Sequence, residues 1–275
     1  MKSRITIGTT LFLVLAVSVS AFAAGPLLFD KTEYAARRAR LMEKIPDGVV
    51  ILLGAAPPTG GEFFQNNEMM YFAGVEIPNA ALIIDGRSKT TTLFFTITDS
   101  GARNEGISLD LVHTAAAVTG IESVSAIDQF TPTLARLAGS GAVLYTSFKP
   151  EELSREYSAE KLTKLQNNMT LNLWDGRLTR ELQFVKTLRE RFPQAVVKDA
   201  APFIWELRSI KSPAEIGHLR KVGRLGVEAH RAMMRATGVG VPEYEMSAAF
   251  EYAAKKAGAR DLAYNVIISS AENHP

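Results

Sequence analysis

The chain has 275 residues, no cysteine, and 31 Lys and Arg residues against 29 Asp and Glu residues. The lack of cysteine excludes disulfides, so stability must come from packing or from a metal held by oxygen and nitrogen ligands. The length and a hydrophobic content of 47% predict a globular protein with two domains.

Residues 1–23 have the pattern of a secretory signal peptide. A basic opening at residues 1–4 precedes an uncharged apolar run at 5–19, and Ala21 and Ala23 form an A-x-A cleavage site. The alternative, a transmembrane anchor, needs about 20 apolar residues, more than this run supplies. We expect export, cleavage after Ala23, a secreted or periplasmic protein, and no stable membrane anchor. A lipoprotein is excluded because there is no cysteine to acylate.

Removal of this leader would leave 252 residues with equal numbers of basic and acidic side chains, because Lys2 and Arg4 leave with it. A nucleic-acid-binding surface should show a basic excess. We therefore expect no nucleic-acid partner.

The first half of the chain alternates between helical and strand-like patterns. Residues 31–44 predict a helix, and the apolar run 49–53 predicts a strand buried on both faces. The further predicted elements are strands at 80–84, 91–96, 121–124 and 142–145 and a helix at 130–137. This alternation predicts an α/β domain with a mixed or parallel sheet.

A polar stretch at 149–172 has the composition of a surface excursion, and a helix is expected at 177–191. After this helix we expect a domain boundary near residues 200–212. The predicted domains are therefore 27–200 and 201–275.

The second domain opens with a strong helix start. Ser212 can cap the helix, Pro213 suits its first position, and Glu215 can complete a capping box. One helical face then carries Ile216, Leu219, Gly223, Gly226, His230 and Met233. Glycine costs stability inside a helix, so Gly223 and Gly226 predict close packing against another element.

A second helix is expected from Pro242, and Gly258 is a typical residue just past a helix end. Its expected buried side carries Met246, Ala249, Phe250 and Ala253. Residues 264–268 then predict a strand, with an exposed apolar edge at 266–268.

The four histidines form no ligand set. His218 and His230 lie on one helix about 18 Å apart, so they cannot share a metal. We expect His230 to be a packed core residue, and His113 and His218 to lie on the surface. His274 comes too near the last residue for any argument from its surroundings.

The carboxylate pairs Glu151–Glu152 and Glu243–Glu245 lie at helix starts, where the helix dipole favours them. Motifs for zinc peptidases, serine hydrolases, phosphate loops and dinucleotide sites are absent from the sequence. The residues by themselves thus indicate no catalytic, cofactor-binding or metal-ligating position.

The stretch LRSIKSPAEIGHLRKVGRLGVEAHRAMM, which begins at Leu207, and the following GVPEYEMSAAFEYAAKKAGARDLAYNVIISSAEN resemble a known family. They are similar to the opening of the pita-bread metallopeptidase domain of Xaa-Pro aminopeptidases (aminopeptidase P) and prolidases. In the family's S-G-x-N turn, which is here Ser270 to Asn273, Ala271 replaces the glycine. FFQNNEMMYFAGVEIPNAALII, residues 63–84, resembles the N-terminal domain of the same enzymes.

This resemblance implies a fold and a function. The fold would be a creatinase- or aminopeptidase P-type α/β domain with a mixed sheet, followed by the truncated start of a pita-bread α+β catalytic domain. The parent protein would release the N-terminal residue from peptides with proline second. It would use two divalent metal ions, usually manganese, and act as a homo-oligomer on proline-containing peptides.

In the family the five metal ligands, two Asp, one His and two Glu, come later than the S-G-x-N turn. The 275 residues are therefore expected to be an inactive N-terminal fragment. Two alternatives stay open: a prolidase that cuts Xaa-Pro dipeptides, and a non-catalytic binding protein that keeps the creatinase fold.

Overall fold

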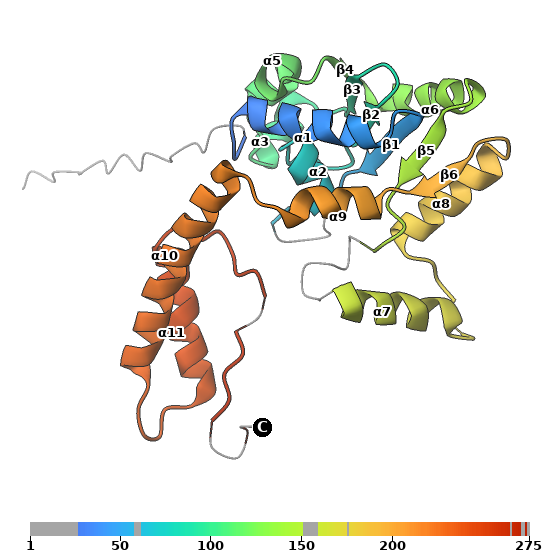
Figure 1. Cartoon of the computed structure of the whole chain (residues 1–275). Helices are drawn as coiled ribbons and strands as arrows, with labels where there is room; N and C mark the ends of the chain where they lie inside the picture. The colour runs from blue at the N-terminus through green and yellow to red at the C-terminus, as the bar shows by residue number, and fades with distance from the viewer. Residues whose placement is uncertain are drawn as a thin grey trace, which may run out of the picture.

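The computed structural model describes residues 27–57, 62–150, 159–174, 176–264, 266–270 and 273. An α/β domain is followed by a pair of long helices that project from it (Figure 1). Within the described residues no helix has the length and apolar character needed to cross a membrane. The predicted signal peptide lies outside them.

One mixed sheet with the strand order β4-β3-β2-β1-β5-β6 organises the first domain. The pairs β1–β2 and β2–β3 are antiparallel, whereas β1–β5, β5–β6 and β3–β4 are parallel. The mixed sheet of the predicted fold class is confirmed. The strands are β1 (Gly48–Leu53), β2 (Ala81–Asp85), β3 (Thr90–Phe94), β4 (Ser123–Ser125), β5 (Val143–Thr146) and β6 (Val197–Asp199).

Strand β1 is buried on both faces, as its continuous apolar run predicts. Val50 and Leu52 belong to the core on one face of the sheet, and Val49 and Ile51 to the core on the other. The register Ile51 opposite Ile83 places apolar side chains of neighbouring strands together. The middle of the sheet is therefore the core of the domain.

Two helical layers cover the sheet. Helices α1, α2, α4, α5 and α9 supply side chains to one core, and α6 and α8 to the other. Their bounds are α1 (Lys31–Lys44), α2 (Asn67–Phe72), α4 (Leu109–His113), α5 (Ala115–Thr119), α6 (Phe130–Gly139), α8 (Arg180–Arg191) and α9 (Ala201–Ser209). The remaining elements before the helix pair are α3 (Asp99–Asn104), the 3-10 turn η1 (Ile127–Gln129) and α7 (Ala159–Leu171).

Helix α1 is fastened to its neighbours by a buried arginine. Arg38 is 2% exposed and donates to the backbone carbonyls of Phe72 (2.9 Å) and Gly120 (3.0 Å). Burial lowers the pKa of Arg38, and the charge of Glu122 opposes that shift. These contacts tie α1 to the ends of α2 and α5.

Several short elements lack a sequence signal. Helices α2 to α5 are five or six residues long, and β6 has three residues. Within the polar stretch 149–172 the structure has helix α7, which was not predicted. Short elements depend on tertiary contacts because a single helical turn is unstable by itself.

The predicted domain boundary at residue 200 stays a prediction. Directly after it, α9 packs on α1, and its Ile204 is fully buried in the core of the sheet domain. The chain leaves that core after Ser209.

The projecting pair consists of α10 (Pro213–Ala236) and α11 (Glu243–Lys256), which pack mainly on each other. The predicted capping box is confirmed, with both Ser212–Glu215 hydrogen bonds present. Gly258 has the left-handed φ of +101° expected just past a helix end. There the amides of Gly258 and Ala259 donate to Lys255 and Ala254, a Schellman arrangement.

Two expectations about this pair are wrong. An added Cβ at Gly223 or Gly226 would meet nothing within 4 Å, so no described element packs closely there. Residues 264 and 266–268 are irregular rather than a strand, and Ile267 is 86% exposed. An isolated segment does not form a strand, because a strand requires a partner for its backbone hydrogen bonds.

The closeness of Gly86 to the end of α1 makes it sensitive to substitution. An added Cβ would lie 2.0 Å from the Ile45 carbonyl oxygen, whereas at Gly139 it would meet nothing within 4 Å. We expect Gly86→Ala to lower the free energy of unfolding by at least about 2 kcal/mol. Gly139→Ala should change it by less than about 1 kcal/mol. Urea unfolding followed by circular dichroism measures both, and equal losses would contradict the packing described here.

Candidate functional site

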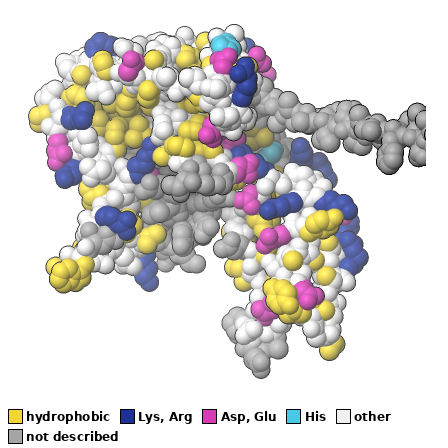
Figure 2. All heavy atoms as spheres, turned by 180° about the vertical axis from the view of Figure 1, so that it is seen from behind, with side chains coloured by type: hydrophobic (Ala, Val, Ile, Leu, Met, Phe, Trp, Pro, Cys, Tyr) yellow, Lys and Arg dark blue, Asp and Glu magenta, His cyan; other side chains and the backbone are white. Residues whose placement is uncertain are grey.

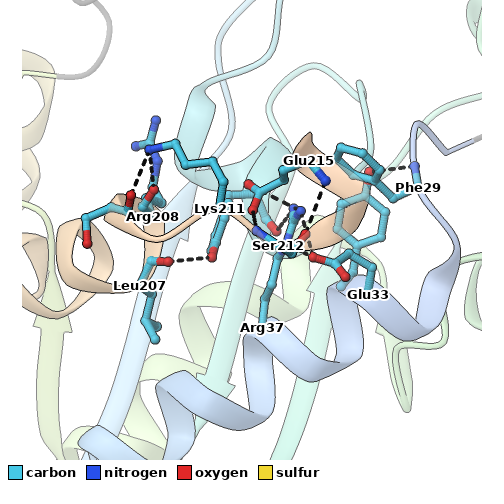
Figure 3. Close-up of polar contacts among 11 residues, drawn as sticks. Phe29, Glu33, Arg37, Leu207, Arg208, Lys211, Ser212 and Glu215 are labelled. Atoms are coloured by element: carbon cyan, nitrogen blue, oxygen red, sulfur yellow. Dashed lines mark hydrogen bonds and ion pairs between the residues drawn. The ribbon is translucent and has the colours of Figure 1, made fainter. Parts of the chain in front are cut away.

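The junction between the sheet domain and the helix pair is built around Arg37 of α1 (Figure 3). Its Nε donates to Glu33 Oε1 at 3.1 Å, and its Nη1 donates to the Tyr71 carbonyl oxygen at 3.1 Å. Its Nη2 lies 3.0 Å from Glu33 Oε1 and 3.4 Å from Glu215 Oε1. Glu215 is the capping-box residue of α10, so one carboxylate both starts that helix and joins it to α1.

Aromatic rings enclose this guanidinium. The Arg37 Cζ atom lies 4.3 Å from the ring centre of Tyr71, 4.9 Å from Phe29 and 5.2 Å from Tyr34. The Tyr71 hydroxyl also donates to the carbonyl oxygen of Leu207, in α9, at 3.0 Å. Cation–π contacts of this kind are worth more when water is excluded, and the Arg37 side chain is only 2% exposed.

A second junction with the sheet domain lies just after the C-terminal end of α11. Arg260 follows α11 and donates through Nη1 to both oxygens of Glu76 at 2.8 Å and through Nη2 to the Phe63 carbonyl at 2.7 Å. Its Nε bonds Glu62, and its Cζ lies 4.4 Å from the Phe64 ring centre. Burial lowers the pKa of Arg260, but the hydrogen bonds to Glu76 and Glu62 outweigh burial and raise it.

Beside Arg260, between the sheet domain and the helix pair, lies a groove of about 920 Å³. Phe63 and Phe64 line it from the sheet domain, Val222 and Leu225 from α10, and residues 258–263 after α11. Its volume suits an organic ligand or a short peptide. Figure 2 shows apolar side chains between the charged ones on the projecting helix pair, as expected for a surface suited to contact with other chain segments.

A buried acid lies near the C-terminal ends of the parallel strands β1 and β5. Glu68 of α2 is 4% exposed, and burial raises its pKa to about 7. The positive charge of Arg208 opposes this increase, while the carboxylates of Glu181 and Asp199 add to it. The sequence contains no signal for this residue, because the groups around it come from α8, the end of β6 and α9.

The histidines are dispersed. His113 is exposed, 3.2 Å from Asp99, and lies on the surface as expected. His218 is partly buried, with its ring centre 6.0 Å from that of Phe29, and it lines the groove. The expected core position of His230 is wrong, because His230 is exposed. Within α10 the fully buried residue is its neighbour Ala229. Its Nδ1 lies 2.8 Å from the Gly226 carbonyl oxygen. His274 lies outside the described residues.

Glu243 and Glu245 both lie in the first turn of α11, as predicted, whereas Glu151 and Glu152 fall outside the described residues. Three hydrogen bonds converge on Glu243 from Ser270 and Asn273, and they lower its pKa. From the sequence we explained the position of Glu243 by the helix dipole alone, and these hydrogen bonds were not predicted.

Within the described ranges, no three His, Asp or Glu side chains lie close enough together to hold a metal ion. The residues in view therefore do not fit a metal centre, and no catalytic step can be assigned to them. What they build is a pair of ionic junctions and a groove between the helix pair and the sheet domain.

The burial of Arg37 predicts a large cost for its removal. We expect Arg37→Ala to lower the free energy of unfolding by about 3–5 kcal/mol, because Glu33 and Glu215 would lose their buried partner. Arg40→Ala, on the exposed side of the same helix, should cost less than about 0.5 kcal/mol. Urea titration of both variants is the measurement, and a small loss at Arg37 would show that the junction is not stabilising.

Glu68 predicts a pH dependence of stability. Its folded pKa of about 7 exceeds the ordinary 4.5, so the folded state binds more protons than the unfolded state between these values. Stability from this group is therefore fully present below pH 4.5 and lost as the pH rises to 7, by up to about 3 kcal/mol.

We expect Glu68→Gln to remove this part of the pH dependence, as measured by urea unfolding at pH 5 and pH 8. The exposed Glu105→Gln should keep the wild-type dependence. An identical pH dependence in wild type and Glu68→Gln would contradict the assignment.

Two family models match the chain in order. Residues 34–145 match the aminopeptidase P N-terminal domain, and residues 217–275 match metallopeptidase family M24. The Xaa-Pro aminopeptidase of Escherichia coli K12 is 25% identical over 256 residues, which are 89% of this chain and 53% of that protein. The Xaa-Pro dipeptidase of Rattus norvegicus is 42% identical over 73 residues, 26% of this chain and 15% of that protein.

Solved structures agree on the fold. Aminopeptidase P from E. coli with the inhibitor Pro-Leu has a TM-score of 0.59 at 22% identity, over 84% of this chain and 51% of that one. Icp55 from Saccharomyces cerevisiae has a TM-score of 0.60 at 20% identity, over 85% of this chain and 49% of that one.

The chain thus spans about half the length of the E. coli aminopeptidase that it matches. An aminopeptidase P-type α/β domain precedes M24 sequence in the same order and on the same fold as in these relatives. Residues 34–145 therefore belong to the aminopeptidase P N-terminal domain family and residues 217–275 to metallopeptidase family M24, in the arrangement of the Xaa-Pro aminopeptidases that the chain resembles.

Proposed function

We propose that the protein is an exported metalloaminopeptidase that releases the N-terminal residue from peptides with proline in second position. The observation that carries this proposal is the similarity to the E. coli Xaa-Pro aminopeptidase, which extends over 89% of the chain. It includes the sheet domain as well as the M24 sequence. The leader-like residues 1–23 support export to a periplasm or the exterior.

A prolidase is the second candidate, and a specific observation favours it. The rat Xaa-Pro dipeptidase is 42% identical, but over only 26% of the chain. Because the aminopeptidase similarity covers both domains and the higher identity covers one short stretch, the aminopeptidase is the better supported proposal.

The proposed cofactor is a pair of divalent ions, manganese, as the M24 membership supports. Since the described residues include no group of three possible ligands, we place the ligands of the whole protein outside those residues. We accordingly expect the 275-residue chain by itself to be inactive. The proposed partners are proline-containing peptides and further copies of the same protein.

An assay of the complete gene product beside the 275-residue chain tests the proposal. With Mn²⁺ present, the complete product should cleave a tripeptide with proline second, lose this activity to a chelator, and regain it with Mn²⁺. The 275-residue chain should show no turnover.

Each other outcome selects a different function. Cleavage of Xaa-Pro dipeptides alone would indicate the prolidase. Turnover by the 275-residue chain would contradict the placement of the ligands. A folded complete product that cleaves neither peptide at any Mn²⁺ concentration would indicate a non-catalytic binding protein.

A further inference from the structure

One carboxylate oxygen in the first turn of α11 accepts hydrogen bonds from residues that come after the irregular segment following this helix. Oε1 of Glu243 accepts hydrogen bonds from the Ser270 amide (2.7 Å), the Ser270 hydroxyl (2.9 Å) and the Asn273 side-chain amide (3.3 Å). The Asn273 amide donates in turn to the Ser270 carbonyl oxygen at 3.0 Å. Glu243 thereby connects the first turn of α11 to residues that come much later in the chain.

The helix dipole does not account for this arrangement. Glu245 lies in the same first turn, where the dipole would stabilise it equally. Among the described residues, however, the Glu245 carboxylate makes no hydrogen bond or ion pair, and only its backbone amide is bonded, to the Pro242 carbonyl oxygen. Three donors converge on one of two neighbouring carboxylates, which indicates a specific connection.

This connection matters because the described part of the segment before Ser270 has no regular secondary structure. Residues 261–264 and 266–270 form neither helix nor strand. One end of this segment is held by Arg260 on Glu76, and the other by Glu243 on Ser270. Residues 261–263 of this segment line the groove between the helix pair and the sheet domain.

We propose that Glu243 is a positioning residue that fixes the Ser270–Asn273 turn, and with it the wall of the groove, relative to α11. Its influence on catalysis rests on the proposed function, because residues 243–273 lie within the M24 match. Glu243 touches no reacting atom in this proposal. It acts by holding the segment that ends at Asn273 in one place.

The first test needs no enzymatic activity. Hydrogen exchange of the Ser270 amide should be at least about tenfold faster in Glu243→Ala than in wild type, because the amide loses its acceptor. Glu243→Gln keeps an acceptor oxygen without the charge and should lie between them. Glu245→Gln is the matched control and should exchange like wild type. Wild-type exchange rates at Ser270 in Glu243→Ala would overturn the proposal.

The pH dependence of the Ser270 amide shift gives a second readout. The hydrogen bonds from Ser270 and Asn273 lower the pKa of Glu243 below its ordinary 4.5. The anchor is therefore fully formed above that value and lost as the pH falls through the lowered pKa. The midpoint should lie below pH 4.5 in wild type, and the transition should be missing in Glu243→Gln.

The last test uses the complete gene product. Glu243→Ala should lower kcat/KM by at least about tenfold while the melting temperature stays within a few degrees of wild type. Glu245→Gln should keep wild-type kinetics. If exchange at Ser270 changes but kcat/KM does not, the positioning role is wrong. If the gene product has no peptidase activity, the proposed function fails, and the exchange data still decide whether Glu243 is the anchor.

Discussion

The buried charge of Arg37 is the constraint on which the arrangement of the two parts depends. A guanidinium removed from water must be paired, and Arg37 meets this requirement with Glu33 of its own helix and Glu215 of α10. Helices α10 and α11 pack mainly on each other rather than on the sheet domain. Ion pairs here and at Arg260 join them to the sheet domain, and the groove lies between the helix pair and that domain.

The two parts of the chain are therefore stabilised in different ways. The sheet domain has two apolar cores, whereas the helix pair is joined to it by ion pairs at Arg37 and Arg260. Salt should weaken the partly exposed pairs at Arg260 more than the buried pair at Arg37. The residues that follow α11 complete the groove, and Glu243 and Arg260 hold both ends of that segment.

Much of the fold could be predicted because its signals are local. The buried strand β1 follows from five consecutive apolar residues, and the start of α10 follows from Ser212, Pro213 and Glu215. The strand expected at 264–268 and the core position of His230 were wrong for a common reason. Both require a neighbouring element, and a pattern within one segment does not say whether that neighbour is present.

The sequence by itself determined the α/β class, the helix boundaries at Ser212 and Gly258, and the resemblance to the family. These depend on hydrogen bonds and burial patterns within a few residues of chain. Only the tertiary structure decided that Arg37 is an ionic junction, that Glu68 has a raised pKa, and that Glu243 is an anchor. Each of these roles arises from partners that are distant in sequence. The sequence of a polar helix does not distinguish a charged side chain that faces water from one that faces a buried partner.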